Sequence, residues 1–149
     1  MSGVVLITGG AGFMGSHLVG LFAASGWQVV VLDKLTYAGS RENLTGIPHR
    51  FILGDVCDRQ LVERSMDGCD LVIHTAAESH VARSFDTARD FIQTNVEGVR
   101  VMLEVASRLG VPRFVHLSTD EVFGSAPAGV AFGIHDRFRP GNPYAASKV

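Results

Sequence analysis

Two polar side chains near the carboxyl end of the chain have the spacing of a proton-transferring pair. Tyr144 and Lys148 are four residues apart, so at helical spacing their side chains share one face. A phenol has a pKa of about 10 and is a poor base at neutral pH unless a nearby cation stabilises the phenolate. With Lys148 as that cation, Tyr144 is a candidate to take a hydroxyl proton while a hydride leaves for an oxidant.

A second set of polar residues, Thr119, Asp120 and Glu121, directly follows an apolar run that ends at Ser118. Neighbouring acids in a surface loop are often merely solvated. After a strand of a parallel sheet, however, they would lie at the carboxyl edge, where open α/β sheets bind their ligands. Together with the Tyr144 pair, they predict a reaction centre at that edge.

A glycine-rich turn near the amino end predicts a phosphate site. Gly9, Gly12 and Gly15 lie between a strand-like run and a helix-like run, which is the order that a dinucleotide-binding turn requires. We expect Gly9 to allow the tight turn, Gly12 to let a pyrophosphate approach the backbone, and Gly15 to let the helix lie close to the sheet. Free N–H groups at the helix start would hold the phosphates. The alternative is a plain loop before a helix.

An acidic residue follows at the position where such a turn needs one. Asp33 ends the second predicted strand, and a carboxylate there accepts hydrogen bonds from a ribose diol and repels a 2′-phosphate. This favours NAD over NADP, although the neighbouring Lys34 weakens the argument. Asp55, after the third strand, would lie near the adenine or serve as a cap or turn residue, and both roles stay open. Residues 75–77 are small and leave room for a cofactor.

The surrounding pattern alternates short β-branched runs with amphipathic stretches, which predicts strands separated by helices. Because the strands are almost continuously apolar, we expect a parallel sheet covered on both faces. Right-handed crossovers then give a doubly wound α/β fold of the Rossmann type. Residues 124–141 predict one long loop. The predicted strands are 4–8, 28–33, 50–54, 71–74 and 113–118, and the predicted helices are 13–25, 58–66 with Asp58 as its cap, 89–109 and one that begins at Pro143.

Composition limits the classes of function. The chain has 149 residues, of which 46% are hydrophobic and 19% charged, and its formal net charge is −2. We therefore expect one dinucleotide-binding domain over 1–149, no nucleic-acid partner, and a cytoplasmic protein without a membrane span. The two cysteines are expected as reduced thiols. His80 has no partner at metal-ligand spacing, so no metal site is predicted, and His74 and His116 are expected in the core or at a sheet edge.

These motifs together resemble those of the extended short-chain dehydrogenase/reductase family, and within it they are most similar to the dTDP-glucose 4,6-dehydratases. The discriminating feature is the pair Asp120 and Glu121 after Ser-Thr. Epimerases of the family lack acids there, and related decarboxylases and GDP-mannose dehydratases tend to keep only the Glu. The resemblance runs through almost the whole chain, at 8–15, 33–39, 54–58, 76–81, 94–95, 118–124 and 143–148.

The resemblance implies an NAD-dependent reaction on a nucleotide sugar, with dTDP-glucose as the expected substrate. The C4 hydroxyl is oxidised, water is eliminated across C5 and C6, and a hydride returns to C6, so that a 4-keto-6-deoxy sugar forms. By resemblance, Tyr144 and Lys148 serve the oxidation. Glu121 is then the base for the C5 proton, and Asp120 is the acid for the departing C6 hydroxyl. Each such role is worth about 10² to 10⁴ in rate.

The same resemblance assigns binding residues. Thr119 would hydrogen-bond the C4 oxygen of the sugar, and Ser79 would contact the sugar. The implied cofactor contacts are Gly9, Gly12, Phe13, Met14, Gly15, Asp33, Lys34, Leu35, Thr36, Asp55, Val56, Thr75, Ala76, Ala77, Glu78, Ser79, Thr94, Tyr144 and Lys148.

Two departures from the family pattern stand out. Phe123 stands where the dehydratases usually carry Tyr. The family's carboxyl-terminal half, with the substrate domain and most of the nucleotide pocket, is absent after Val149, so we expect a truncated chain. The family forms homodimers through the helix at 89–109 and the helix that begins at Tyr144, and only the first of these is complete here.

Two other functions remain open on the sequence. The same scaffold serves other nucleotide-sugar epimerases, dehydratases and decarboxylases, and product analysis would distinguish these from the expected reaction. The third hypothesis is an inactive truncated module that binds a dinucleotide or only folds. Turnover assays on this chain beside a longer version would test it.

Overall fold

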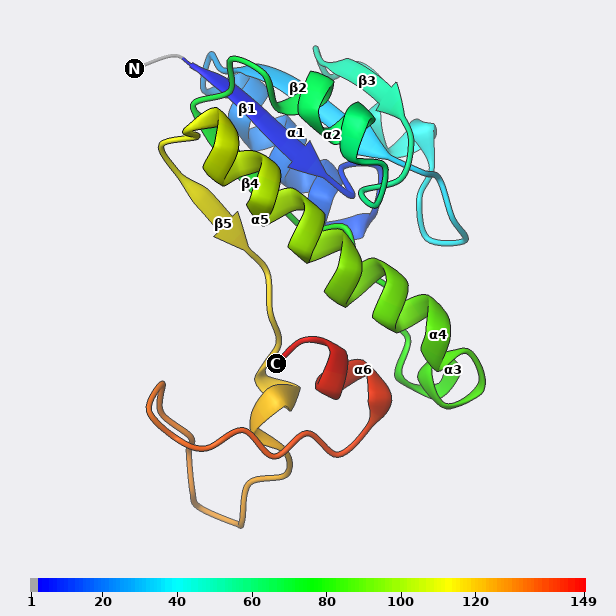
Figure 1. Cartoon of the computed structure of the whole chain (residues 1–149), viewed down its shortest axis with the longest axis vertical. Helices are drawn as coiled ribbons and strands as arrows, with labels where there is room; N and C mark the ends of the chain where they lie inside the picture. Colours follow the sequence, from blue (N-terminus) through cyan, green and yellow to red (C-terminus); the bar gives the residue numbers. More distant parts are fainter. Residues whose placement is uncertain (1–2) are drawn as a thin grey trace.

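The structure is a computed structural model that describes residues 3–149. Its centre is a five-stranded parallel sheet with the strand order β3-β2-β1-β4-β5 (Figure 1). The order reverses next to β1, which confirms the predicted doubly wound fold. Residues 1 and 2 of the predicted domain lie outside the described residues. The strands are β1 (Val4–Thr8), β2 (Gln28–Asp33), β3 (Arg50–Leu53), β4 (Leu71–His74) and β5 (Phe114–His116).

Helices cover both faces of the sheet because the strands present apolar side chains to both. Val5 and Ile7 of β1 belong to the core under α1, whereas Leu6 between them belongs to the core under α2 and α5. In Figure 1, α5 runs in front of the sheet and α1 lies behind it. The helices are α1 (Phe13–Ala24), α2 (Arg59–Met66), α3 (Val81–Asp86), α4 (Ala88–Phe91), α5 (Gly98–Leu109) and α6 (Pro143–Ser147).

The long helix predicted at 89–109 is present but contains a wider turn. α4 continues into η2 (Ile92–Glu97), a π-helical segment, and then into α5, which ends at Gly110 with a φ of +67°. π-helical turns occur frequently at functional sites, because the extra residue redirects side chains. Nothing in the apolar periodicity of this helix predicted the turn.

Short elements and element ends differ from the prediction. Three short helices were not predicted, since each is too short to show an apolar period: η1 (Arg41–Leu44), α3 and η3 (Asp120–Phe123). β5 is shorter than the predicted 113–118 because only three of its residues pair with β4. Asp58 caps α2 as predicted, with its side chain accepting from the Leu61 N–H at 3.1 Å.

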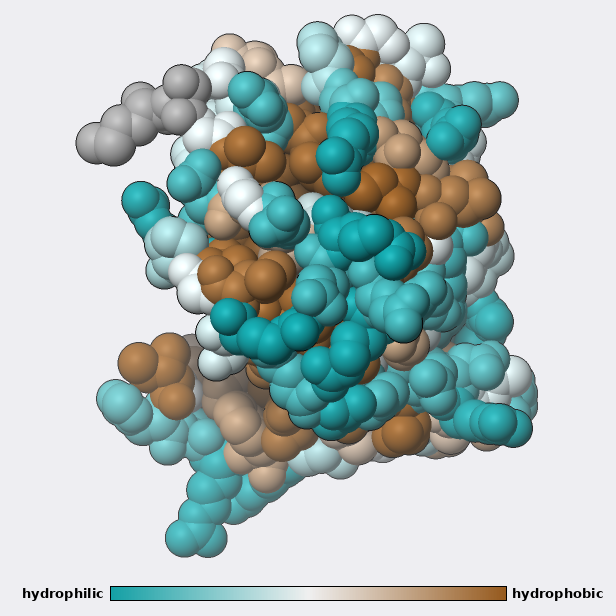
Figure 2. Space-filling view, turned by 45° about the horizontal axis from the view of Figure 1, so that its top comes forward, coloured by the Kyte–Doolittle hydropathy of each residue, from teal (hydrophilic) through white to brown (hydrophobic). Residues whose placement is uncertain are grey.

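The outer face of α2 and α5 is polar and carries a network of ion pairs. Arg100 pairs with Glu97 and Glu104 on its own helix, and Arg59 of α2 pairs with Glu104. Figure 2 shows hydrophilic residues with hydrophobic patches between them on this side of the molecule. Within residues 3–149, none of the helices is both long and apolar enough to cross a membrane. Both cysteines are free thiols, as predicted.

Candidate functional site

The glycine turn after β1 forms a tight cradle at the start of α1. Gly9 has a φ of +66°, in the left-handed region that favours glycine, and a Cβ there would lie 2.7 Å from the backbone of Ala76. A Cβ on Gly15 would lie 2.1 Å from the carbonyl oxygen of Gly9, so helix and turn touch directly. Gly12 caps α1 with no side-chain hydrogen bond, which leaves backbone N–H groups at the helix start free for an anion.

Asp33 braces this turn from the end of β2. Its Oδ2 accepts from the N–H of Ala11 at 2.9 Å, and its Oδ1 accepts from the N–H of Leu35 at 2.8 Å. Leu35 has a φ of +54° and is the one non-glycine residue of the described chain with a positive φ. A carboxylate has about four acceptor sites, so Asp33 keeps capacity for a ribose diol beside its backbone partners.

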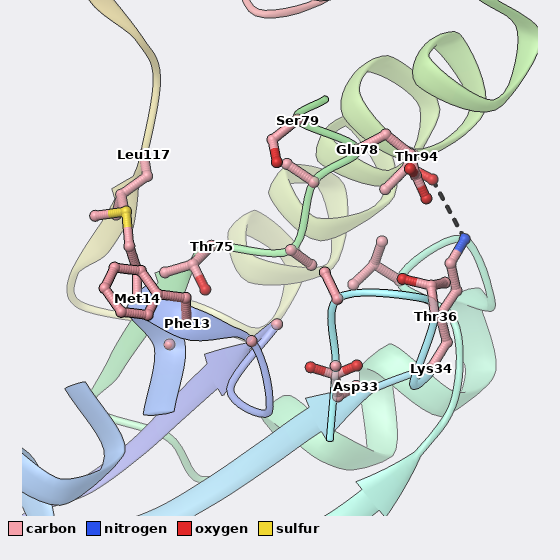
Figure 3. Close-up of a pocket in the computed structure, with 18 of the residues that line it drawn as sticks. Phe13, Met14, Asp33, Lys34, Thr36, Thr75, Glu78, Ser79, Thr94 and Leu117 are labelled. Carbon is pink, nitrogen blue, oxygen red and sulfur yellow. Dashed lines mark hydrogen bonds between the residues drawn. The ribbon is translucent and has the colours of Figure 1, made fainter. Parts of the chain in front are cut away.

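Lys34 points away from Asp33 and pairs with two other side chains. Its Nζ lies 3.2 Å from Oδ2 of Asp55 and donates to Oγ1 of Thr94 at 3.3 Å (Figure 3). Burial alone would raise the pKa of Asp55, but the backbone N–H of Cys57 and the charge of Lys34 lower it below its ordinary value. Asp55 therefore partly neutralises the charge of Lys34, which weakens the objection that this residue posed to a preference for NAD.

The loop after β4 forms a second wall and is held by Asn95 of the π-helical segment. Asn95 accepts from the backbone N–H of Glu78 at 2.9 Å and donates to its carbonyl oxygen at 2.8 Å. The same amide donates to Oγ of Ser147 in α6 at 2.8 Å. Asn95 thus joins the β4 loop to α6. The sequence offered only a polar residue within a long helix as a signal for this role.

Tyr144 and Lys148 both line a cavity at the carboxyl edge of the sheet. Nζ of Lys148 donates to the carbonyl oxygen of Leu117 at 2.6 Å, and Oγ of Ser118 donates to the carbonyl oxygen of Lys148 at 3.0 Å. The Tyr144 ring packs edge-on against Phe91. Burial lowers the pKa of Lys148 to about 8, so its ammonium group stays largely protonated at neutral pH.

Two histidines lie in the sheet on the same side as Lys148. His74 is fully buried, its Nδ1 is 2.6 Å from Oγ1 of Thr8, and its ring stacks on His116 at 5.3 Å. Burial first, and then the charges of His116 and Lys148, lower the pKa of His74 to about 3. Both histidines are core or half-buried sheet residues, as predicted, and burial also lowers the pKa of His116 to about 4, so both imidazoles are neutral at neutral pH.

Thr119, Asp120 and Glu121 form the start of η3, next to this edge. Oγ1 of Thr119 caps η3 by accepting from the Glu121 N–H at 3.2 Å. Oε2 of Glu121 accepts from Nδ2 of Asn142 at 2.8 Å, and Asn142 in turn caps α6 through the Ala145 N–H. One amide side chain therefore links Glu121 to the helix of Tyr144. No pattern in the sequence indicated this role for Asn142.

A cavity of about 490 Å³ runs along the carboxyl edge between these walls (Figure 3). Seventeen of the nineteen predicted cofactor contacts line it, and the exceptions are Leu35 and Asp55. Leu35 packs against the core under α1, and Asp55 is engaged with Lys34. Thr119, Asp120 and Glu121 lie outside the cavity. The lining residues that were not predicted as cofactor contacts are Leu32, Ala38, Gly39, Gly54, Leu117 and Ser118.

Across residues 3–149, no cluster of three or more His, Cys, Asp or Glu side chains has the arrangement of a metal site. His80 precedes α3 at its amino end and is exposed.

Comparisons with known proteins place this geometry in a family. The sequence profile described as the NAD dependent epimerase/dehydratase family matches residues 5–149. A dTDP-glucose 4,6-dehydratase of Streptomyces niveus is 49% identical over 97% of this chain and 46% of its own length. The low-salt glycan biosynthesis protein Agl12 of Haloferax volcanii is 47% identical over 97% of this chain and 48% of its own length. The chain thus spans about half the length of these relatives.

Solved structures give the same result. The structure of DesIV, a dTDP-glucose 4,6-dehydratase from Streptomyces venezuelae with NAD and TYD bound, is 45% identical with a TM-score of 0.93, over 97% of this chain and 48% of that one. A UDP-glucose 4-epimerase from Brucella ovis in complex with NAD is 29% identical with a TM-score of 0.89, over 98% of this chain and 44% of that one. The chain therefore belongs to the NAD dependent epimerase/dehydratase family.

Proposed function

We propose that this chain is the NAD-binding part of a dTDP-glucose 4,6-dehydratase. The observation that carries the proposal is the acidic pair Asp120 and Glu121, of which Asn142 links Glu121 to α6, the helix that bears Tyr144 and is followed by Lys148. Relatives with 49% and 45% identity are dTDP-glucose 4,6-dehydratases, which supports this reaction over others of the family. Because the chain spans about half of these proteins, the activity, the substrate and the cofactor are proposed for the whole catalytic unit.

The cavity fits NAD. The glycine turn and the uncapped start of α1 would hold the pyrophosphate through free backbone N–H groups. Glycine at position 15 keeps the turn and the helix in this arrangement, because a Cβ there would collide with the turn. Asp33 would accept from the adenine ribose and repel a 2′-phosphate, and the pairing of Lys34 with Asp55 reduces the attraction of Lys34 for such a phosphate. When bound, NAD would supply the acceptor for the C4 hydride and the donor of the same hydride to C6.

Tyr144 and Lys148 would carry out the proton transfer of the oxidation. Both line the end of the cavity next to β5. The protonated Lys148, desolvated and fixed on the carbonyl oxygen of Leu117, would favour the phenolate of Tyr144 through its charge. Tyr144 would then take the proton of the C4 hydroxyl. Ser118 lines the cavity and Thr119 does not, so Ser118 is a second candidate beside Thr119 for contact with the C4 oxygen.

The elimination residues would act outside the cofactor cavity. Nearly all predicted cofactor contacts line the cavity, whereas Asp120 and Glu121 lie beyond it. This division suits a dinucleotide inside the cavity and a sugar next to Tyr144, on the side of η3. There Glu121 would remove the C5 proton, which the 4-ketone acidifies, and Asp120 would protonate the departing C6 hydroxyl. Ser79, which lines the cavity wall, would contact the sugar.

Product analysis tests the proposed reaction. The chain would be incubated with NAD and dTDP-glucose beside a chimera that continues it with the second half of the Streptomyces niveus relative. The chimera should convert dTDP-glucose to the 4-keto-6-deoxy sugar, with the loss of one water by mass spectrometry. A product that keeps the mass of the substrate would instead indicate an epimerase, and a chimera that binds NAD but leaves dTDP-glucose unchanged would contradict the proposed substrate.

The acid and base roles have a direct test in the same chimera. Asp120→Asn with Glu121→Gln should preserve oxidation at C4 and block elimination, so that reduced dinucleotide accumulates, as measured by its absorbance after the addition of substrate. Unchanged product formation would refute the assignment. If the chain alone binds NADH without turnover while the chimera turns over, the chain is a binding module that needs the second half for catalysis.

We also propose a homodimer through the long helix. Ile92, Val96 and Leu103 are about half exposed and lie along this helix, where an ion-pair network flanks them. Exposed apolar side chains with a polar rim are typical of interaction surfaces. Analytical ultracentrifugation should find a dimer for the wild-type chain and a monomer for Leu103→Lys. A monomeric wild-type chain would show that the long helix is not sufficient to hold two copies of this chain together.

A further inference from the structure

One cation–π contact joins two separate segments beside the cavity. Cζ of Arg83, in α3, lies 4.1 Å from the ring centroid of Tyr37, in the loop after β2. Such contacts are attractive within about 6 Å of the ring centroid. The Arg83 side chain is 39% exposed and Tyr37 is 56% exposed, so the contact lies at the surface.

The two segments belong to different walls of the cavity. Thr36 and Ala38, the sequence neighbours of Tyr37, line one wall, and Glu78 and Ser79, shortly before α3, line another (Figure 3). Tyr37 itself does not line the cavity, and neither does Arg83. Their contact therefore ties the walls together from outside the space that a ligand would fill.

Arg83 is anchored on its own side by a buried carboxylate. Its Nη1 lies 3.6 Å from Oε2 of Glu78, a residue with 6% of its surface exposed. That oxygen is buried and has no hydrogen-bond partner, so the charge of Arg83 compensates it. The backbone of Glu78 is fixed by two hydrogen bonds to Asn95. The guanidinium group is thus held at the wall formed by the β4 loop, while the Tyr37 ring of the loop after β2 lies against it.

We propose that Tyr37 and Arg83 form a clasp that slows the release of the dinucleotide. The inference rests on the proposed function, in which the hydride removed from C4 returns to C6. The same dinucleotide then serves successive turnovers and has no need to exchange. A dinucleotide leaves when the loop at 34–40 separates from the segment at 75–79, and this separation breaks the Tyr37–Arg83 contact.

The release rate of NADH from the purified chain tests the clasp. NADH is displaced by excess NAD, and the loss of its fluorescence gives the rate. Tyr37→Ala and Arg83→Ala should each speed release about two- to tenfold, the size expected for a partly exposed cation–π contact. The double variant should release no faster than the quicker single variant, since both remove one contact. Tyr37→Phe, which keeps the ring, should release at the wild-type rate.

A second contact of the same kind provides the matched control. Cζ of Arg41 lies 4.3 Å from the ring centroid of Phe51, and neither residue lines the cavity. Arg41→Ala should leave the release rate unchanged. If it speeds release as much as Arg83→Ala does, the effect comes from a general loss of stability, and the clasp is wrong.

A readout without cofactor completes the test. In the ligand-free chain, Arg83→Ala should increase hydrogen exchange of the backbone amides at 34–40. If Arg83→Ala does not fold, Arg83→Lys takes its place in this measurement. It keeps the charge beside Glu78 but loses the planar guanidinium group over the Tyr37 ring, so it should show the same increase. Unchanged hydrogen exchange at 34–40 in these variants would overturn the clasp but leave the proposed cofactor standing. Wild-type release rates in Tyr37 and Arg83 variants that bind NADH would have the same consequence. A wild-type chain that does not bind NADH would overturn the proposed cofactor and the clasp with it.

Discussion

The dinucleotide cradle, residues 3–39 and 71–79, differs in construction from the carboxyl-terminal segment, residues 117–149. In the cradle, three adjacent parallel strands are buried on both faces, and the backbone of the glycine turn itself forms the site. In the carboxyl-terminal segment, no residue of the loop at 124–141 is buried. Its helix α6 is fixed by a few side-chain bonds, from Asn95, Ser118, Asn142 and Lys148.

In the proposed function, this difference separates the groups that bind the dinucleotide from those that would carry out the reaction. The cradle is held by sheet pairing and core packing, so its geometry is preformed. The proposed reactive groups of the carboxyl-terminal segment are positioned by one short helix and by individual hydrogen bonds, each worth about 0.5–1.5 kcal/mol. We therefore expect changes in the cradle to act on dinucleotide affinity and on global stability. Changes in the carboxyl-terminal segment should act locally.

The largest expected effect comes from the closest contact in the cradle. Gly15→Val should abolish measurable NADH binding, because its Cβ would lie 2.1 Å from the Gly9 carbonyl oxygen and force the turn and helix apart. Fluorescence titration with NADH measures the loss. Gly20→Ala in the same helix is the control, since its Cβ would meet only Ile47 at an ordinary 3.6 Å. Retained affinity in a folded Gly15→Val variant would show that the cradle is less rigid than its packing implies.

The next effect tests dinucleotide choice within the cradle. Asp33→Ala should weaken NAD binding about tenfold to a hundredfold, the range for hydrogen bonds to a charged group, and should weaken NADP binding less. The carboxylate also braces the backbone of Ala11 and Leu35, and that loss affects both dinucleotides alike. The ratio of the two affinities, measured by titration, therefore isolates the ribose contact. An equal loss for NAD and NADP would contradict the assigned role.

The pH dependence of stability separates the two regions. The pKa of His74, in strand β4 of the cradle, falls from 6.5 to about 3 on folding, so the unfolded chain binds more protons between these values. Stability should thus decrease as the pH falls from about 6.5 towards 3. The pKa of Lys148 falls from 10.5 to about 8, so Lys148 contributes increasing stability as the pH rises through that window, which the raised pKa of the buried Cys69 thiol, about 11, partly offsets. Each pKa unit corresponds to about 1.4 kcal/mol.

Variants assign the two limbs of this profile. In denaturant unfolding, His74→Gln should lose less stability at acid pH than the wild type and gain as much at alkaline pH. Lys148→Met should lose as much stability at acid pH as the wild type and gain less at alkaline pH. If neither variant changes its own limb, other groups govern the pH dependence, and the burial of these side chains does not carry the energetic cost that we assign to it.

The smallest effect compares two helix caps. Asn142→Ala removes the cap of α6, and Asp58→Ala removes the cap of α2, each at a cost of about 1 kcal/mol. The Asp58 variant should lower the global unfolding free energy, because α2 packs on the central core. The Asn142 variant should mainly raise hydrogen exchange at 143–148. A similar global loss in both variants would show that the carboxyl-terminal segment unfolds together with the sheet.

Local patterns were sufficient to predict most of the fold. All five strands and the long helix could be recognised, because buried parallel strands are apolar throughout and the helices are amphipathic over several turns. The helices η1, α3 and η3 could not, since four to six residues show no period. The glycine turn and Asp33 were equally local, because the turn, the strand end and their spacing lie within one stretch of chain.

The roles of Asn95 and Asn142 could not be predicted from the sequence, for a physical reason. Asn95 bonds residues 17 and 52 positions away in sequence, and Asn142 bonds Glu121 at a distance of 21 positions. Such pairs leave no periodic or adjacent signal. The same holds for Lys34, whose partners Asp55 and Thr94 became evident only when the strands were side by side.

The sequence by itself therefore determined the parallel sheet, the glycine turn and the identity of the polar residues at the sheet edge. Each of these follows from backbone conformation and burial over a few neighbouring residues. Only the tertiary structure decided which of those polar groups share the cavity, that Lys34 is partly neutralised, and that Arg83 reaches Tyr37. These outcomes depend on side chains that are distant in sequence and that the connections between parallel strands bring together. Each of these contacts can form and stabilise the molecule only after the sheet has formed.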